Sequence, residues 1–159
     1  MPEAPDRAAP RVILAFDFGR RRIGVASGDT ISRSASPLGV LPPCSGGPPW
    51  DAIAALLAEW RPAVAVVGLP YNADGSESPL AREARAFAAE LAGRYPVRVE
   101  MVDERYSSLE AQTRLREARV SGLRRKRVAK SDVDAAAACV ILERWFEERG
   151  GRTNANTNR

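Results

Sequence analysis

Three acidic residues stand at positions from which they could do chemistry together. Asp17 lies in the apolar run 12–19, Glu104 follows the apolar run 97–102, and Asp134 opens a helical segment near the C-terminus. A buried charge without a partner costs several kcal/mol, so Asp17 requires a cation or a metal. Three converging carboxylates would bind Mg2+ or Mn2+, and two such ions about 4 Å apart can activate water and stabilise the leaving oxygen in phosphodiester cleavage.

Strand and helix geometry decides which acids can meet. Successive side chains of a strand point to opposite faces, so only one of Asp103 and Glu104 can readily converge with Asp17. Asp132 lies off the stripe of the last helix that faces inward. Asp134 lies on that stripe, which it shares with three apolar residues: Ala138, Ile141 and Trp145.

The same acids could have simpler structural roles, which the sequence leaves open. Asp17 could form a salt bridge with Arg20 or Arg22. Residues 131–134, Ser-Asp-Val-Asp, fit a helix capping box, in which the acids favour the first turn. Asp132 also leaves open which acid of this helix would act as a ligand.

Composition narrows the chemistry. The chain has 159 residues, no histidine and a net charge of +4. The absence of histidine excludes Ser-His-Asp triads, histidine general bases and histidine-ligated metals. The basic balance favours a polyanionic partner such as nucleic acid.

Targeting features are absent from the sequence pattern. No apolar stretch reaches the roughly 18–20 residues that span a bilayer, and the first ten residues have no apolar core of a signal peptide. Cys44 and Cys139 have neither metal nor redox spacing. We therefore expect no membrane association and a cytoplasmic, reducing location.

The pattern of apolar residues predicts one α/β domain. Residues 1–10 are expected to be a disordered lead-in, residues 11–149 a single domain, and residues 150–159 a disordered tail. Three antiparallel strands come first, and Pro37 suits the third to a sheet edge. The strands are expected at 12–18, 23–27, 31–41, 63–68 and 97–102, and the helices at 50–60, 79–91, 107–117 and 132–148.

This order predicts a ribonuclease H-like fold, with a five-stranded mixed sheet and helices on both faces. Alternation of strands and helices in the second half implies parallel strands with right-handed crossovers. Functional sites of such sheets gather beyond the carboxyl ends of the parallel strands. The three acids follow or precede elements at that edge.

A basic segment offers contacts for a polyanion. Residues 114–130 carry eight Lys/Arg against one acid, and the candidate substrate contacts are Arg124, Arg125, Lys126, Arg127 and Lys130. Five phosphate contacts on a single strand would give a log-log salt slope of roughly −3.5. The segment could instead be a solvated linker.

Two further positions are candidates for substrate binding. Ser107 starts a helix whose N-terminus could hold a phosphate, although capping explains the Ser107 to Glu110 pattern equally. Asn72 lies in residues 71–75, which could form a rim that holds substrate or only a turn.

Four ordered motifs resemble the YqgF/RuvX family, nucleases of 16S ribosomal RNA precursors that are also described as Holliday junction resolvase-like. The motifs are Ala-Phe-Asp-Phe-Gly at 15–19 with Ile-Gly-Val-Ala at 23–26, Val-Gly-Leu-Pro-Tyr-Asn-Ala-Asp-Gly at 67–75, Val-Asp-Glu-Arg-Tyr-Ser-Ser at 102–108, and residues 133–143. They span about residues 12–148. Ser108 departs from the threonine usual in the family, and Asp132 is an added acid.

The resemblance implies a ribonuclease H-like fold and a metal-dependent acid triad, which falls on Asp17, Glu104 and Asp134. Arg105 would neutralise phosphate or orient Glu104. The implied activity is that of a cytoplasmic Mg2+- or Mn2+-dependent endonuclease that matures the 5′ end of pre-16S rRNA, with ribosomal particles among its partners.

Three other functions stay open at this stage. Structured DNA such as a four-way junction is a competing substrate for the same chemistry. A noncatalytic nucleic-acid-binding module would keep the fold without turnover. The stretch from Asp17 to Gly24 also resembles a phosphate loop of sugar kinases and actin-like ATPases, but the chain is too short for their second domain.

Overall fold

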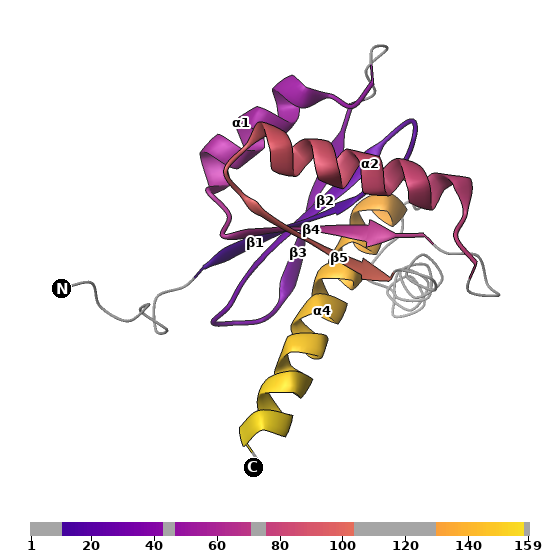
Figure 1. The fold of residues 1–159 in the computed structure, drawn as a ribbon. Helices are drawn as coiled ribbons and strands as arrows, with labels where there is room; N and C mark the ends of the chain where they lie inside the picture. The colour runs from indigo at the N-terminus through magenta and orange to yellow at the C-terminus, as the bar shows by residue number, and fades with distance from the viewer. Residues whose placement is uncertain (1–10, 43–46, 71–75, 104–129, 158–159) are drawn as a thin grey trace, which may run out of the picture.

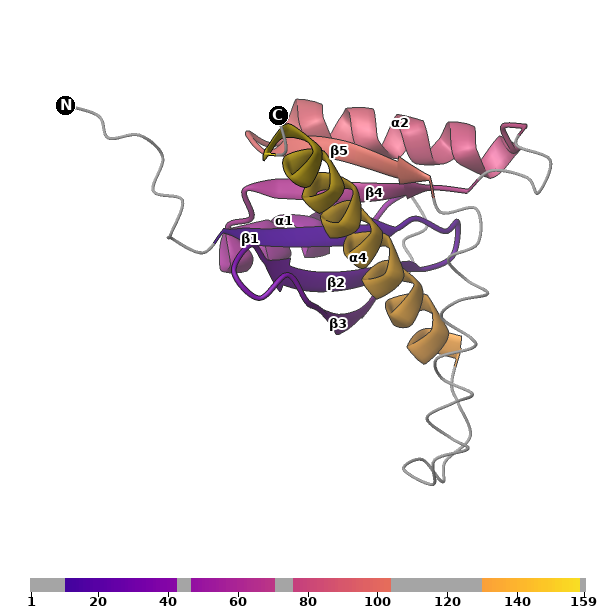
Figure 2. The same cartoon turned by 90° about the horizontal axis from the view of Figure 1, so that it is seen from below.

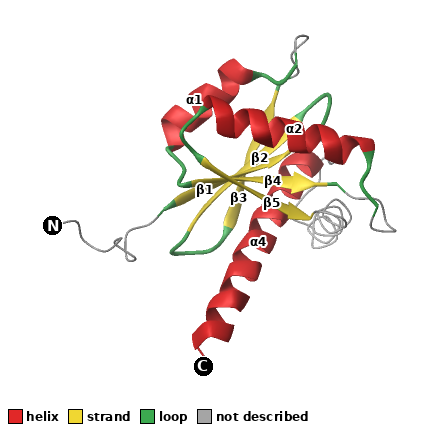
Figure 3. Cartoon of the chain, in the orientation of Figure 1, coloured by secondary structure: helices red, strands yellow, loops and turns green. Residues whose placement is uncertain are grey.

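The computed structural model describes residues 11–42, 47–70, 76–103 and 130–157, and the side chains of the last helix over 135–149. These residues form one five-stranded sheet in the order β3-β2-β1-β4-β5 with helices packed against it (Figures 1 and 3). The elements are β1 (Val12–Asp17), β2 (Ile23–Asp29), β3 (Ala35–Leu41), α1 (Trp50–Trp60), β4 (Val64–Leu69), α2 (Pro79–Arg94), β5 (Arg98–Asp103) and α4 (Lys130–Thr157).

The sheet is mixed, as predicted. β1 pairs antiparallel with β2 and β2 with β3, whereas β1, β4 and β5 run parallel. Interior residues of β1 and all of β4 are buried, because both strands are apolar on both faces and lie in the middle of the sheet. Pro37 lies in β3, which is the expected edge strand.

Helices cover both faces of the sheet, again as predicted. α1 and α2 pack on one face, where Phe16, Val67 and Phe87 belong to a single buried cluster. α4 packs on the other face, where Ala15, Val66 and Ile141 belong to a second cluster. Figure 2 shows the sheet between α2 and the long α4. The sheet face that a residue occupies therefore identifies its helix neighbours.

The third strand begins later than predicted, at Ala35 instead of residue 31. The carboxylate of Asp29 accepts the backbone N–H groups of Ile31 and Ser32 at 2.9 and 2.8 Å. This closes a turn that uses residues the alternating pattern had assigned to the strand. Ile31 consequently lies in the turn and is 57% exposed.

The last helix is longer than predicted. α4 runs to Thr157, whereas the sequence predicted an end at residue 148 and a disordered tail from residue 150. Gly150 and Gly151 weaken a helix by about 1 kcal/mol each, but they keep the N–H donors that a helix requires. The predicted lead-in and the helix predicted at 107–117 lie outside the described residues. No helix in the described ranges is long and apolar enough to cross a membrane.

A polar cluster fastens α4 to the edge strand β5. The indole Nε1 of Trp145 donates to Glu100 Oε1 at 2.8 Å, and Arg149 and Arg98 form ion pairs with the same carboxylate at 2.5 and 2.8 Å. The Arg149 guanidinium also lies 4.5 Å from the centre of the Trp145 ring. Partial burial alone would raise the pKa of Glu100, but the hydrogen bonds from Trp145 and Arg149 outweigh it and hold the pKa below its ordinary value of 4.5.

The Glu100 cluster makes part of the stability depend on pH. A carboxyl whose pKa is lowered by folding stabilises the folded state above its unfolded pKa, and this stabilisation is lost as the pH falls through the folded pKa. We expect Glu100→Gln to lower the free energy of unfolding at pH 7 by about 1–2 kcal/mol. The same variant should flatten the loss of stability below about pH 4.5. Urea unfolding at pH values between neutral and acidic measures both effects.

Glu90→Gln is the matched control, because Glu90 is an exposed residue of α2 whose partner is Arg94 one turn away. This variant should lose stability at acidic pH to the same extent as the unaltered protein. If Glu100→Gln also lost stability at acidic pH to the same extent as the unaltered protein, the role given to Glu100 would be contradicted.

Candidate active site

Asp17 ends the central strand β1 and occupies its α4 face. Ile13 and Ala15, two and four residues before it, belong to the cluster under α4, while Leu14 and Phe16 belong to the opposite cluster. Because side chains alternate along a strand, Asp17 continues the α4-side row. Its side chain is half-buried and pairs across the ladder with Gly24 of β2. The sequence prediction of an acid at the carboxyl end of a central strand is confirmed.

The two faces of β5 separate its acids. Val102 lies in the α4-side cluster, and Glu100 contacts α4 through Trp145. Val99 and Met101 pack against the opposite cluster, and Asp103 continues their row. Asp103 therefore lies on the face opposite to that of Asp17, which is consistent with the expectation that only one of Asp103 and Glu104 converges with it. Glu104 lies outside the described residues.

A glycine separates the two acid-bearing strands. Val64 and Val66 of β4 lie in the α4-side cluster, so Gly68 continues that row between β1 and β5. It is buried and has no side chain, and it is the ladder partner of Val102. On this face, β4 therefore contributes no side chain between Asp17 of β1 and Val102 of β5.

Gly68 was not among the residues proposed from the sequence. The available signal was a glycine inside an otherwise apolar strand, which often marks a place where another group approaches the backbone closely.

The stripe predicted for the last helix is present. Ala138, Ile141 and Trp145 are buried against the sheet, with at most 5% exposure. Arg144 fixes the helix at the same end of the sheet, because its Nη1 donates to the carbonyl oxygen of Asp103 at 2.9 Å. Figures 1 and 2 show that α4 begins on the side where β1, β4 and β5 end. Asp134 lies in the first turns of this helix.

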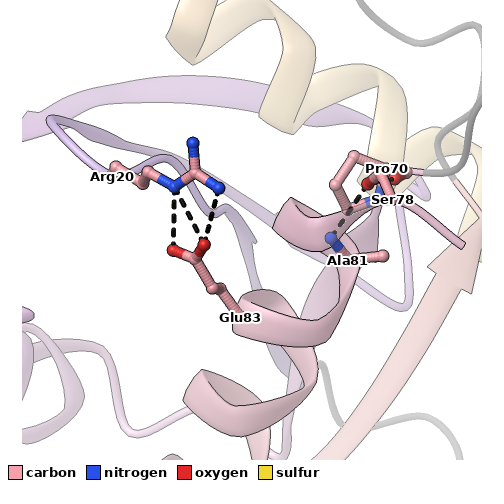
Figure 4. Close-up of polar contacts among 5 residues, drawn as sticks. All are labelled: Arg20, Pro70, Ser78, Ala81 and Glu83. Atoms are coloured by element: carbon pink, nitrogen blue, oxygen red, sulfur yellow. Dashed lines mark hydrogen bonds and ion pairs between the residues drawn. The ribbon is translucent and has the colours of Figure 1, made fainter.

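Two loops beside Asp17 are attached to the start of α2 (Figure 4). Arg20, after β1, donates from Nε to both oxygens of Glu83 at 3.0 and 2.9 Å and from Nη2 to Oε2 at 2.6 Å. Ser78, after β4, accepts the N–H of Ala81 at 3.0 Å as the helix cap and donates to the Pro70 carbonyl at 2.5 Å. The start of α2 thus contacts Arg20 after β1 and Pro70 after β4.

The Arg20–Glu83 pair bears on one alternative for Asp17. The hydrogen bond with Glu83 raises the pKa of Arg20, and the same hydrogen bond lowers the pKa of Glu83. The Arg20 guanidinium is therefore engaged with α2, which disfavours it as the sole compensating cation for Asp17. The alternative pairing with Arg22 stays open.

A pocket of about 370 Å³ lies directly after Asp17. Its wall is formed by the turn between β1 and β2 and by the loop before α1, and Glu83 closes one side. The lining residues are Phe18, Gly19, Arg20, Arg21, Arg22, Ile23, Pro42, Gly47, Pro48, Pro49 and Glu83. The sequence had indicated only a basic turn at residues 20–22.

The structure describes only a few of the remaining predicted site residues. Lys130 and Asp134 are placed by backbone in α4, but their side chains are not described. The others lie outside the described residues: Glu104, Arg105, Ser107, Asn72, Arg124, Arg125, Lys126 and Arg127. Within the described ranges there is no group of three acids, cysteines or histidines around one point, and two of the three predicted ligands fall outside that search.

Comparisons with known proteins identify the family of this chain. The model of the RuvX family, described as Holliday junction resolvase, matches residues 11–148. A protein of Edwardsiella ictaluri named "Putative pre-16S rRNA nuclease" is 47% identical over 88% of this chain and 97% of its own length. A protein of the same name from Marinobacter nauticus is 46% identical over 89% of this chain and 96% of its own length.

Solved structures show the same fold at low sequence identity. RuvC of Thermus thermophilus in complex with a Holliday junction substrate is 19% identical, with a TM-score of 0.51, over 88% of this chain and 96% of that chain. The fowlpox virus resolvase in complex with Holliday junction DNA is 14% identical, with a TM-score of 0.53, over 86% and 97%. The predicted ribonuclease H-like fold is confirmed by these neighbours.

The absence of a side chain at Gly68 leads to a prediction. A valine at this position would suit a strand but would place a branched side chain between Asp17 and the end of β5. We expect Gly68→Val to weaken Mn2+ binding at least about tenfold, which isothermal titration calorimetry would measure. Gly93→Ala is the control, because a Cβ at Gly93 meets nothing within 4 Å. Unchanged Mn2+ binding by a folded Gly68→Val variant would refute the role of Gly68.

Proposed function

Because this chain belongs to the RuvX family, we propose that it is a metal-dependent endonuclease that hydrolyses phosphodiester bonds and matures the 5′ end of pre-16S rRNA. Asp17, Glu104 and Asp134 are the proposed ligands of Mg2+ or Mn2+. The proposal places the enzyme in the cytoplasm, where it acts on rRNA precursors in association with ribosomal particles. Relatives at 45–47% identity that carry the name of a pre-16S rRNA nuclease support the substrate.

The position of Asp17 carries the proposal. Its carboxylate is half-buried on the α4 face, in the same row as Gly68 of β4. The next residue of the α4-side row on β5 after Val102 would be Glu104, and α4 begins at this same edge with Asp134 in its first turns. A set of carboxylate oxygens from three elements fits a hard divalent cation.

The other predicted site residues would have separate roles in catalysis and substrate binding. When bound, the metal ions would supply an activated water and stabilise the leaving oxygen. Arg105 would neutralise the scissile phosphate or orient Glu104. Ser107 and Asn72 would hold substrate at the rim, and the basic segment would contact the phosphates of the flanking strand through Arg124, Arg125, Lys126, Arg127 and Lys130.

Structured DNA is the second candidate substrate, because the family is described as Holliday junction resolvases. Cleavage of an RNA that spans the 5′ end of pre-16S rRNA should be compared with cleavage of a four-way DNA junction at equal protein and Mn2+ concentrations. Cleavage of the junction alone would replace the RNA proposal. Binding of either substrate without turnover would instead favour a noncatalytic module.

Removal of the first ligand tests the chemistry. Asp17→Asn keeps the shape of the side chain but removes the charge that the metal needs, so we expect metal-dependent cleavage to fall at least about 100-fold. The variant should remain folded, because asparagine has nearly the same volume and can still form hydrogen bonds. Asp51→Asn, an exposed acid in the first turn of α1, is the control and should cleave normally. Undiminished cleavage by Asp17→Asn would exclude Asp17 as a ligand.

Neighbouring acids allow a second test with internal controls. Strand alternation predicts that Glu104→Gln abolishes cleavage while Asp103→Asn retains most of it. The helical stripe likewise predicts that Asp134→Asn is inactive and Asp132→Asn active. Rates for all four variants at saturating Mn2+ would measure this. Loss of activity in Asp103→Asn or Asp132→Asn, with its partner variant active, would reassign the ligand.

A further inference from the structure

We propose that the pocket after Asp17 is a subsite for one nucleotide of the substrate strand, with its phosphate held by the arginines of the β1–β2 turn. The proposal rests on the proposed nuclease function, because it identifies where the strand beside the cleaved bond would lie. The volume of about 370 Å³ is within the range of roughly 300–1,000 Å³ for small-molecule sites.

The pocket is coupled to the candidate active site by chain geometry. Phe18 and Gly19, the two residues that follow Asp17, are part of its lining. The turn is tight at this point, since a Cβ on Gly19 would lie 2.6 Å from the carbonyl oxygen of Arg22. Phe18 belongs to the α1/α2 side of the sheet and Asp17 to the α4 side, so a substrate strand at Asp17 would reach this pocket by passing over the end of β1.

One wall of the pocket is apolar and firmly supported. Phe18 packs on Phe87 of α2 with ring centres 5.1 Å apart, and Phe87 in turn stacks on Trp50 at 5.5 Å. Pro48 and Pro49 line the same pocket. Flat apolar surfaces of this kind suit a base or a ribose, whose faces stack without sequence-specific hydrogen bonds.

The other wall is basic. Arg20, Arg21 and Arg22 line the pocket together with one carboxylate, that of Glu83. Arg21 is exposed and forms no ion pair within the described part of the chain. The guanidinium forks that bind carboxylates also bind phosphates with two parallel hydrogen bonds.

Glu83 occupies the fork of Arg20 in the absence of substrate. The pair is exposed to solvent, with side-chain exposures of 60% for Arg20 and 43% for Glu83, so the contact is weak enough to be exchanged. A phosphate entering the pocket can take over the hydrogen bonds of Arg20. Glu83 thus opposes binding by its charge while it keeps Arg20 in a binding geometry.

Binding to the pocket can be tested without cleavage. Uridine 5′-monophosphate should be titrated into the full chain in the presence of EDTA, and backbone amide signals followed by NMR. We expect chemical-shift changes at Phe18, Gly19 and Gly47. Changes confined to residues 114–130, or no changes at saturating nucleotide, would overturn the proposal.

Matched charge changes then test the phosphate contact. Arg21→Gln should weaken binding of a short single-stranded RNA about threefold to tenfold and reduce the salt slope by about 0.7. Arg11→Gln removes the same charge at the opposite end of β1 and should leave binding nearly unchanged. Equal losses in both variants would show only a general effect of net charge and would contradict the pocket.

Glu83→Gln should have the opposite effect on RNA binding. Release of Arg20 should strengthen binding of the same RNA about threefold. Weaker or unchanged binding in a folded variant would contradict the exchange. The outcomes are separable from the proposed function: active Asp17→Asn would refute the function, whereas inactive Asp17→Asn with equal binding by Arg21→Gln and Arg11→Gln would refute only the subsite.

Discussion

The alternation of side chains along the central strand is the constraint on which the rest of the structure depends. Five residues of β1 before Asp17 are apolar on both parities, so the strand must be covered on both faces. Once α1 and α2 cover one face and α4 the other, Asp17 is committed to the α4 face. Every other group that can act with it must come from that face or from beyond the strand end.

The packing of α4 then determines how well a second acid-bearing element is positioned. Its apolar stripe is buried against the sheet, Trp145 and Arg149 bind the carboxylate of Glu100, and Arg144 binds the carbonyl of Asp103. These contacts lie in the middle of the helix and fix its axis against β5. The stability of the fold and the placement of the site are thus supplied by the same helix.

The elements with a strong apolar period were predictable from the sequence, because burial alone determines them. The bounds of α1, Trp50–Trp60, were predicted exactly. The start of β3 was wrong, because a hydrogen-bonded turn built on the Asp29 side chain competes with a weak alternating pattern. The Arg20–Glu83 pair joins residues far apart in the chain, so it became visible only when the fold placed α2 beside the β1–β2 turn. The metal-binding triad of Asp17, Glu104 and Asp134 is still a prediction.

The order of the strands also decides from which side a large substrate can arrive. β5 is an edge strand, with no further strand beyond it in the described sheet, while β1 lies at the centre. The proposed site lies between the centre of the sheet and its β5 edge. A substrate strand that approaches from this edge would therefore have to extend inward past β5 and β4 before it reached Asp17.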